Sequence, residues 1–179
     1  EVFPVGAESV GEGARYISNY VGMTEVRKII TNPIAYVSEN ASARFYSVIY
    51  SKGKSYFDTG GRVVLNGKGS SGEVISRVVS EGGTVISRQM LSGNEAGTFG
   101  HMECSGLLLN ENGVIHSIPE LRGAHPDTNL THEAAVGKIS SEELGYLMTR
   151  GLTEEEARSL IIRGFLDIFV GPDHGGRLN

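Results

Sequence analysis

Two short stretches of the chain carry residue types that could bind a metal ion. Residues 100–106 read GHMECSG and contain the only cysteine, Cys104, and residues 129–136 read NLTHEAAV with His132 beside Glu133. Thiolate, imidazole and carboxylate groups are the side chains that bind transition metals in proteins. The competing interpretation is that Cys104 is a small buried hydrophobe, which is the commonest role of a single cysteine.

A β-strand restricts which of these side chains can share a site, because side chains alternate between its two faces. In a regular strand Cys104 shares a face with Met102, whereas His101 points to the opposite face. The HxxC spacing is therefore weak support for a site. The same alternation separates His132 from Glu133 unless a bulge or a strand end intervenes.

The remaining candidate ligands carry less weight. His116 in VIHSIP and His125 in GAHPD are interpreted as turn or core residues rather than ligands. Glu120 precedes an LRG turn, and only its position suggests that it faces the site. Asp173 and His174 in GPDHGG could bind a stray metal ion, although a mobile tail is the simpler interpretation.

Composition limits the kind of protein that could hold such a site. The chain has 179 residues, 39% of them hydrophobic, which suits one domain with a real core. Its net charge of −5, with scattered Lys and Arg, disfavours nucleic acid and anionic membranes as partners. There is no membrane span or signal-peptide pattern, and one cysteine cannot form an internal disulfide, so we expect a cytoplasmic protein.

Glycines punctuate a series of short β-rich runs, among them RVVLNG, EVISRVVSEGG, TVISRQMLSG and GLLLNENG. Overlaying the runs gives a period of about 22 residues, from Ala41 through Arg62 and Thr84 to Gly106. A fixed period with turns between short strands predicts a mainly β fold, a solenoid of stacked parallel coils over residues 35 to about 136. An antiparallel sandwich remains the alternative, because its strands also recur at short intervals.

The pattern changes to helical after Lys138. Ser140 and Glu143 form a capping box, and Gly151 ends the first predicted helix. Thr153 and Glu156 form a second capping box. An apolar stripe follows, which we expect to pack partly on the end of the solenoid and partly on a partner: Ala157, Leu160, Ile161, Gly164, Phe165 and Ile168.

These helices resemble a DNA-binding helix-turn-helix, but the negative residues 154–156 would face phosphates, which disfavours that function. The predicted organisation is a β-helix core over 1–138, a helical domain over 139–170 and a tail over 171–179.

Residues 129–166 closely resemble the C-terminal signature of the SufB/SufD family of iron–sulfur cluster assembly proteins. The shared pattern comprises HEA-x-x-(G/S)-K-I, L-x-Y-L-M-x-R-G, an E-E-A segment and R-G-F. Glu133 in HEA matches the SufB branch, whereas SufD-type chains have HGA. The resemblance implies a right-handed parallel β-helix followed by a helix-turn-helix-like pair of α-helices, in a short archaeal or deep bacterial form that acts as a homodimer.

The resemblance also implies a function, that of a scaffold on which a nascent iron–sulfur cluster is built and from which it is transferred. Cys104 and Glu133 are the implied ligands, and His132 assists from the same or the facing chain. Clusters usually need four protein ligands, so two protomers of a homodimer or a SufB–SufD-type heterodimer would each contribute these residues. Mixed ligation with one thiolate makes a cluster easier to give away.

The implied partner is a SufC-type ABC ATPase that docks on the C-terminal helices. The docking residues predicted there are Glu143, Leu147, Arg150, Leu160 and Phe165. The chain has no GxxxxGK(S/T) motif, so we expect ATP hydrolysis in the partner and no enzymatic activity in the chain itself. A sulfur donor and recipient apo-proteins complete the set of partners.

The family's second, upstream cysteine, thought to receive sulfur first, is absent here. Either the chain is a C-terminal fragment of a longer protein, or sulfur arrives by another route, such as sulfide.

Two other functions remain open. A β-helix enzyme acting on carbohydrate or in acyl transfer is disfavoured, because the period places Glu81 near Glu103 without any recurring row of carboxylates, and because the chain lacks tryptophan. A structural partner of an ATPase, with an inert Cys104, keeps the fold and the helices but has no metal site.

Overall fold

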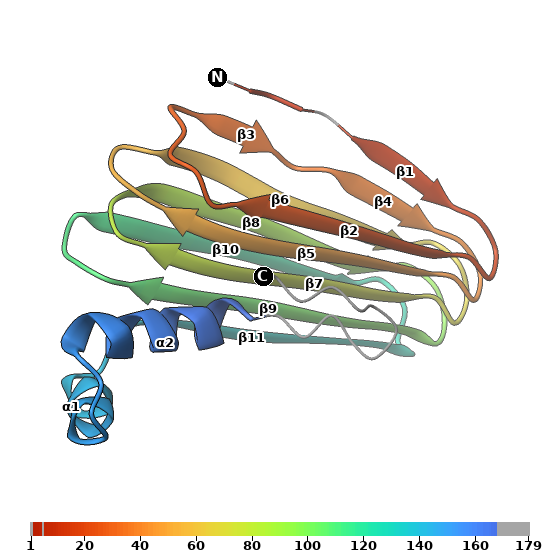
Figure 1. Cartoon of the computed structure of the whole chain (residues 1–179). Helices are drawn as coiled ribbons and strands as arrows, with labels where there is room; N and C mark the ends of the chain where they lie inside the picture. The colour runs from red at the N-terminus through yellow and green to blue at the C-terminus, as the bar shows by residue number, and fades with distance from the viewer. Residues whose placement is uncertain (1, 5, 168–179) are drawn as a thin grey trace.

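The computed structural model describes residues 2–4 and 6–167, and most of them lie in β-strands (Figure 1). The predicted ligands Asp173 and His174 and the stripe residue Ile168 lie outside the described residues. The strands are Ala7–Val10 (β1), Arg15–Gly22 (β2), Ile29–Thr31 (β3), Ile34–Val37 (β4), Ser42–Ser51 (β5), Tyr56–Leu65 (β6), Ser71–Ser80 (β7), Gly83–Gly93 (β8), Thr98–Leu108 (β9), Gly113–Gly123 (β10) and Thr128–Lys138 (β11).

The strands form two sheets that face each other. Sheet A has the order β1-β4-β6-β8-β10, with β3 also paired to β6, and sheet B has the order β11-β9-β7-β5-β2. From β4 onwards, successive strands alternate between the sheets, and the pairing within each sheet is parallel. The molecule is therefore a parallel β-solenoid of about five turns, which confirms the predicted fold and excludes the antiparallel sandwich.

The predicted period of about 22 residues is wrong. Ser42 pairs with Ser71 and Ser71 with Phe99, so neighbouring coils in sheet B are 29 and 28 residues apart. From β5 onwards each coil holds two strands of ten or eleven residues. Two of the three overlaid steps, from Ala41 to Arg62 and from Thr84 to Gly106, compare strands of opposite sheets, which shortens the apparent period. Consequently Glu103 lies beside Ile75 rather than near Glu81.

A column of turn residues carries the true period. Gly13, Asn40, Gly69 and Gly97 all have positive φ, and the N–H of each donates to a carbonyl in the corresponding turn of the next coil. Only glycine, and to a lesser extent asparagine, adopts this left-handed conformation readily. These four residues mark the same corner of successive coils.

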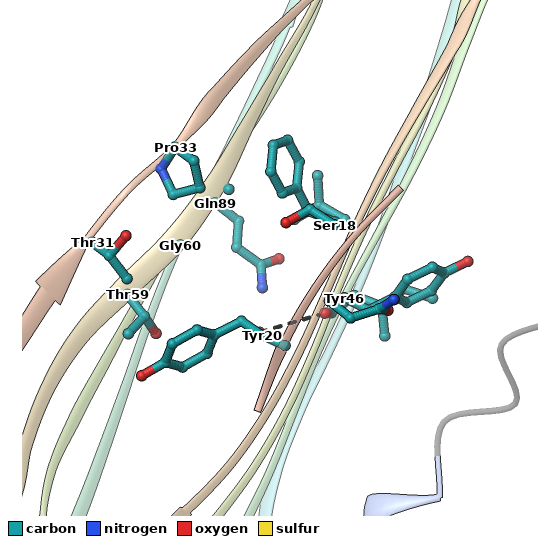
Figure 2. Close-up of a pocket in the computed structure, with 14 residues that line it drawn as sticks. Ser18, Tyr20, Thr31, Pro33, Tyr46, Thr59, Gly60 and Gln89 are labelled. Carbon is teal, nitrogen blue, oxygen red and sulfur yellow. Dashed lines mark hydrogen bonds between the residues drawn. The ribbon is translucent and has the colours of Figure 1, made fainter. Parts of the chain in front are cut away.

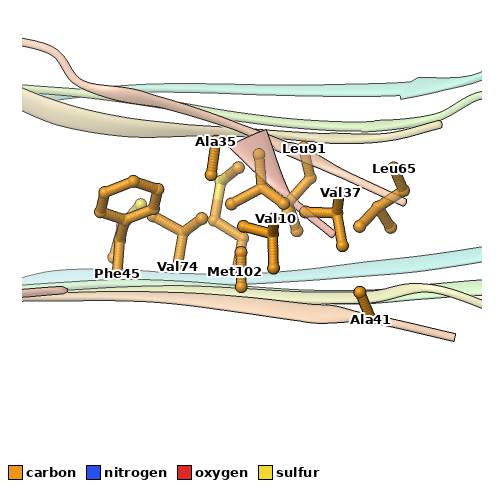
Figure 3. Close-up of a cluster of buried hydrophobic side chains, with 12 residues drawn as sticks. Val10, Ala35, Val37, Ala41, Phe45, Leu65, Val74, Leu91 and Met102 are labelled. Atoms are coloured by element: carbon orange, nitrogen blue, oxygen red, sulfur yellow. The ribbon is translucent and has the colours of Figure 1, made fainter. Parts of the chain in front are cut away.

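The hydrophobic core lies between the two sheets (Figure 3). Inward-facing residues of sheet A, such as Leu65 and Leu91, pack against Val74 and Met102 of sheet B. Alternation along each strand places every second side chain in this layer. Burial of each aliphatic side chain contributes about 1.5–3 kcal/mol to the free energy of folding. The apolar layer between the sheets therefore favours the register in which these side chains face inward.

Two helices follow the last strand, α1 (Ser141–Thr149) and α2 (Glu154–Leu166). The Ser140 hydroxyl accepts from the backbone N–H groups of Glu142 and Glu143, and the capping box of Thr153 and Glu156 is complete in both directions. Gly151 has φ +98° in the turn between the helices, which confirms its predicted role.

Helix α2 packs against the outer face of sheet B, not on the end of the solenoid as predicted (Figure 1). Leu166 is buried against Val48, Val79 and Leu107, and partly buried residues of α2, such as Ile161, add to the cluster. The outer face of β7 and β9 is apolar at this point, so the helix covers surface that water would otherwise contact.

Candidate functional site

Cys104 lies inside the solenoid. Its strand, β9, alternates as predicted, with Met102, Cys104 and Gly106 buried and Glu103 half-buried on the outer face. Cys104 is 1% exposed, and its register neighbours are Ser76 on β7 and Ala134 on β11. The last coil therefore covers the thiol.

A series of hydrogen bonds links the thiol to other buried polar side chains. Cys104 Sγ donates to Gln89 Oε1 at 3.0 Å, and Gln89 Nε2 donates to Ser87 Oγ at 3.3 Å. Ser87 Oγ in turn donates to Ser76 Oγ at 3.3 Å across the interior. Burial, assisted by the charge of Glu103, raises the pKa of Cys104 to about 11, so the thiol stays protonated at neutral pH.

These hydrogen-bonded side chains belong to a longer row of polar residues that runs along the solenoid axis. Tyr20, Ser47, Ser76 and Cys104 occupy the same register position on β2, β5, β7 and β9. On the facing sheet, Thr59, Ser87 and Ser117 share one register position on β6, β8 and β10. Polar residues at inward positions cost free energy unless they are hydrogen-bonded, so the members of this row need partners inside the solenoid.

A cavity of about 160 Å³ opens from this row between the sheets, near β2 (Figure 2). Its lining includes Tyr20, Thr59, Gly60 and Gln89, and the Thr59 hydroxyl is buried without a partner among the described residues. Gln89 thus lines the cavity and also contacts Cys104. Sequence reasoning missed Gln89, although its spacing from Val85 and Leu91 in an alternating strand marks it as an inward polar residue.

The other two predicted ligands lie on opposite faces of β11. His132 is the register neighbour of Met102 on the inner side, and its Nε2 is buried without a partner in the described part of the chain. Glu133 is exposed on the outer face, where its register neighbour is Glu103. Cys104 and His132 thus share the inner wall, and a regular strand keeps Glu133 apart from both.

The structure therefore does not bring Cys104, Glu133 and His132 together within one chain. Among residues 2–4 and 6–167, no three His, Cys, Asp or Glu side chains are grouped closely enough to hold a metal ion. In this conformation the side chains of Cys104 and Glu133 of one protomer lie on opposite faces of sheet B.

The last coil has an uncovered edge. Strands β10 and β11 end sheets A and B, so one side of each backbone has no neighbouring strand in the described chain. Leu121 and Val136 are 39% and 47% exposed, although the register neighbour of Leu121, Leu91, is fully buried in the preceding coil. An edge with core-like side chains is typical of an interface.

The helices present a second exposed surface. Of the predicted docking residues, Glu143 and Arg150 are exposed, Leu160 is 51% exposed and Leu147 is partly buried. Phe165 instead packs within the chain against sheet B.

Sequence reasoning missed Tyr146, which is 58% exposed on α1. Arg150 Nη2 donates to its hydroxyl at 3.1 Å.

Three of the lesser candidates lie within the described residues, and none of them is grouped with other possible metal ligands there. His125 Nδ1 accepts from the Asp127 N–H at 3.0 Å and is a turn residue, as predicted. His116 is exposed on β10, so it is neither the turn residue nor the core residue that was predicted. Glu120 is exposed on the same strand and accepts from Arg122 Nε at 2.6 Å. No helix within the described residues has the length and apolar character to cross a membrane.

Comparison with known proteins places these features in a family. The family model for the SUF system FeS cluster assembly, SufBD core domain, matches residues 6–165. An iron-sulfur cluster assembly SufBD family protein of Archaeoglobus fulgidus is 47% identical over 170 residues, covering 95% of this chain and 46% of that protein. A protein of the same name from Methanothermobacter thermautotrophicus is 45% identical over 172 residues, covering 95% of this chain and 42% of its own length.

A bacterial relative of the same name, from Staphylococcus epidermidis, is 32% identical over 137 residues, covering 75% of this chain and 30% of that protein. The chain thus spans less than half the length of these relatives.

Proposed function

This chain belongs to the SufBD family of iron–sulfur cluster assembly proteins, and we propose that it is a SufB-like scaffold subunit that builds and transfers a nascent cluster. The observation that carries the proposal is the position of Cys104, the only thiol, on the same inner wall as His132 and one coil from an uncovered edge. The HEA sequence at Glu133 supports the SufB-like assignment within the family.

The proposed ligands are Cys104, Glu133 and His132, and the cluster is the cargo of the scaffold. One chain cannot supply four thiolates, so a second copy, or a SufD-type chain, would provide the remaining ligands. Because Cys104 is covered and Glu133 faces outward, cluster building requires the last coil, β10 and β11, to rearrange.

The uncovered edge supports the proposed dimer. Strands β10 and β11 offer unpaired backbone groups, and Leu121 and Val136 offer apolar surface. Pairing of equivalent edges across a two-fold axis would bury both and place two copies of Cys104 and His132 near the axis. The homodimer and the SufB–SufD-type heterodimer use this edge in the same way.

The helices support docking of a SufC-type ABC ATPase. Tyr146 and Leu160 are apolar residues left exposed on α1 and α2. Nucleotide-driven movement of the partner would favour a conformation with α1 and α2 displaced, which is a population shift toward an open last coil. In this scheme ATP is hydrolysed in the partner, and the chain itself is a non-enzymatic scaffold.

The polar interior supports delivery of sulfur as a small species. The cavity near β2 reaches Gln89, whose side chain contacts the thiol of Cys104. A sulfur donor would deliver sulfur at the cavity near β2. Recipient apo-proteins would take the finished cluster at the opposite end of the solenoid, the edge formed by β10 and β11. The proposed compartment is the cytoplasm, where a free thiol stays reduced.

Anaerobic reconstitution tests the proposal. The wild type, Cys104→Ala, His132→Ala and Glu133→Ala are incubated with ferric iron, sulfide and a thiol reductant, and visible absorption, iron and sulfide per protomer, and transfer to an apo-ferredoxin are measured. Ser105→Ala is the matched control, because Ser105 lies beside Cys104 but faces outward. A cluster in the wild type and control, lost in the Cys104 variant, supports the scaffold; equal content in all variants supports a structural partner with an inert thiol.

A further inference from the structure

Arg77 on β7 contacts the C-terminal end of helix α2 from the outer face of sheet B. Its Nη1 donates to the backbone carbonyl of Phe165 at 3.1 Å, and its guanidinium carbon lies 5.9 Å from the centre of the Phe165 ring. The last carbonyls of a helix have no partner within the helix, and a cation there complements the helix dipole. Phe165 lies in the last turn of α2, so Arg77 supplies both interactions from the sheet.

The same guanidinium also binds the strand that carries Cys104. Arg77 Nη2 lies 2.9 Å from Glu103 Oε1, and Glu103 also accepts from Ser105 Oγ at 3.0 Å. Glu103 precedes Cys104 on β9, and its register neighbour on β11 is Glu133. Like charges side by side on neighbouring strands repel, and Arg77 offsets this repulsion at Glu103.

We propose that Arg77 is a positioning residue that couples the docking of α2 to the packing of β9 around Cys104. The proposal rests on the proposed function, in which a partner moves the helices. When α2 leaves the sheet, Arg77 loses its hydrogen bond to the Phe165 carbonyl and its contact with the Phe165 ring. The ion pair between Arg77 and Glu103 then changes its geometry. Coupling is reciprocal, so opening at β9 also weakens the docking of α2.

The chain contains a matched control for this contact. Arg44 on β5 pairs with Glu73 on β7 at 3.4 Å, on the same outer face of sheet B. Glu73 also accepts from the Tyr46 hydroxyl, so this cluster joins β5 to β7. Removal of Arg44 therefore tests the loss of an Arg–Glu pair from this sheet without the link between α2 and β9.

The reactivity of Cys104 measures the coupling. As the only cysteine, and 1% exposed, it reacts with a small disulfide reagent, 4,4′-dithiodipyridine, only when β9 or the coil that covers it opens. Ile161→Asp undocks α2 at a residue in the apolar cluster on sheet B. We expect this change to raise the labelling rate about tenfold, within the usual range of coupling between sites.

The double variant separates coupling from simple loss of packing. Arg77→Met raises the rate by a similar factor, and Ile161→Asp adds nothing further in that background, because the link is already broken. Arg77→Lys keeps the positive charge but lacks the several N–H donors of the guanidinium group, so it gives a labelling rate between those of the wild type and Arg77→Met. Arg44→Met leaves the rate unchanged.

Two results would overturn the coupling. If the effects of Ile161→Asp and Arg77→Met multiply, the helix acts on β9 through apolar packing alone. If Arg44→Met raises labelling as much as Arg77→Met, the rate follows overall stability, which urea unfolding of each variant measures separately. The assay contains no iron, sulfide or ATPase, so a failed reconstitution would refute the scaffold function and leave the coupling result standing.

Discussion

The buried thiol should make the stability of the native state depend on pH in the alkaline range. Burial raises the pKa of Cys104 from its ordinary value of 9.0 to about 11, so the native state retains a proton that the unfolded chain loses. The resulting stability is fully present below pH 9 and is lost as the pH rises to 11. At pH 10 the loss attributable to this thiol is about 1.4 kcal/mol, and above pH 11 it levels off at about 2.7 kcal/mol.

The Cys104→Ala variant isolates this contribution. Tyr46 and Tyr50 also have pKa values raised to about 12, mainly by burial, but they are present in both proteins and cancel in the comparison. The free energy of unfolding in urea, under reducing and metal-free conditions, is measured for both proteins at pH 8 and pH 10. The wild type should lose about 1.4 kcal/mol more than the variant. An equal loss in the two proteins would show that the thiol is solvated, and the placement of Cys104 inside the solenoid would be refuted.

Three further predictions concern the core, the edge and the helices. Met102→Ala removes a fully buried side chain and should lower the free energy of unfolding by about 2–5 kcal/mol, measured by urea unfolding; a loss below about 1 kcal/mol would contradict the packing of the inner layer. Leu121→Asp places a charge on the uncovered edge, so analytical ultracentrifugation should show the proposed dimer in the wild type and a folded monomer in the variant, whereas a dimer that persists in the variant would place the interface elsewhere. Deletion of residues 140–179 should abolish co-purification with a SufC-type ATPase, because both helices are lost, and retained binding would place the dock on the solenoid.

The fold was largely predictable because its signals are local. Short runs rich in β-branched residues and separated by glycine indicate a solenoid, and the capping box at Thr153 and the turn at Gly151 define the helix pair. The period was not found, because runs in opposite sheets have similar composition. The positive-φ column of Gly13, Asn40, Gly69 and Gly97 holds the correct spacing, but asparagine breaks the glycine pattern.

The site was predictable only in its residue types. Alternation along one strand correctly places Cys104 on the inner face. The relation of Cys104 to Glu133 depends on the pairing of β9 with β11, which fixes Ala134 beside Cys104 and turns Glu133 outward. Contacts such as those of Gln89 with the thiol and of Arg77 with α2 join residues from different elements, so spacing in the sequence cannot reveal them.

The most direct test of the scaffold function uses the single cysteine as a nuclear magnetic resonance probe. Protein labelled with [3-¹³C]cysteine gives one resonance, that of Cys104, because the chain contains no other cysteine. Reconstitution with iron and sulfide should shift and broaden this resonance strongly, because a ligating sulfur carries unpaired electron density from the cluster to its own β-carbon. A resonance unchanged in a sample that holds stoichiometric iron and sulfide would show that the cluster lies elsewhere and that Cys104 is a packing residue.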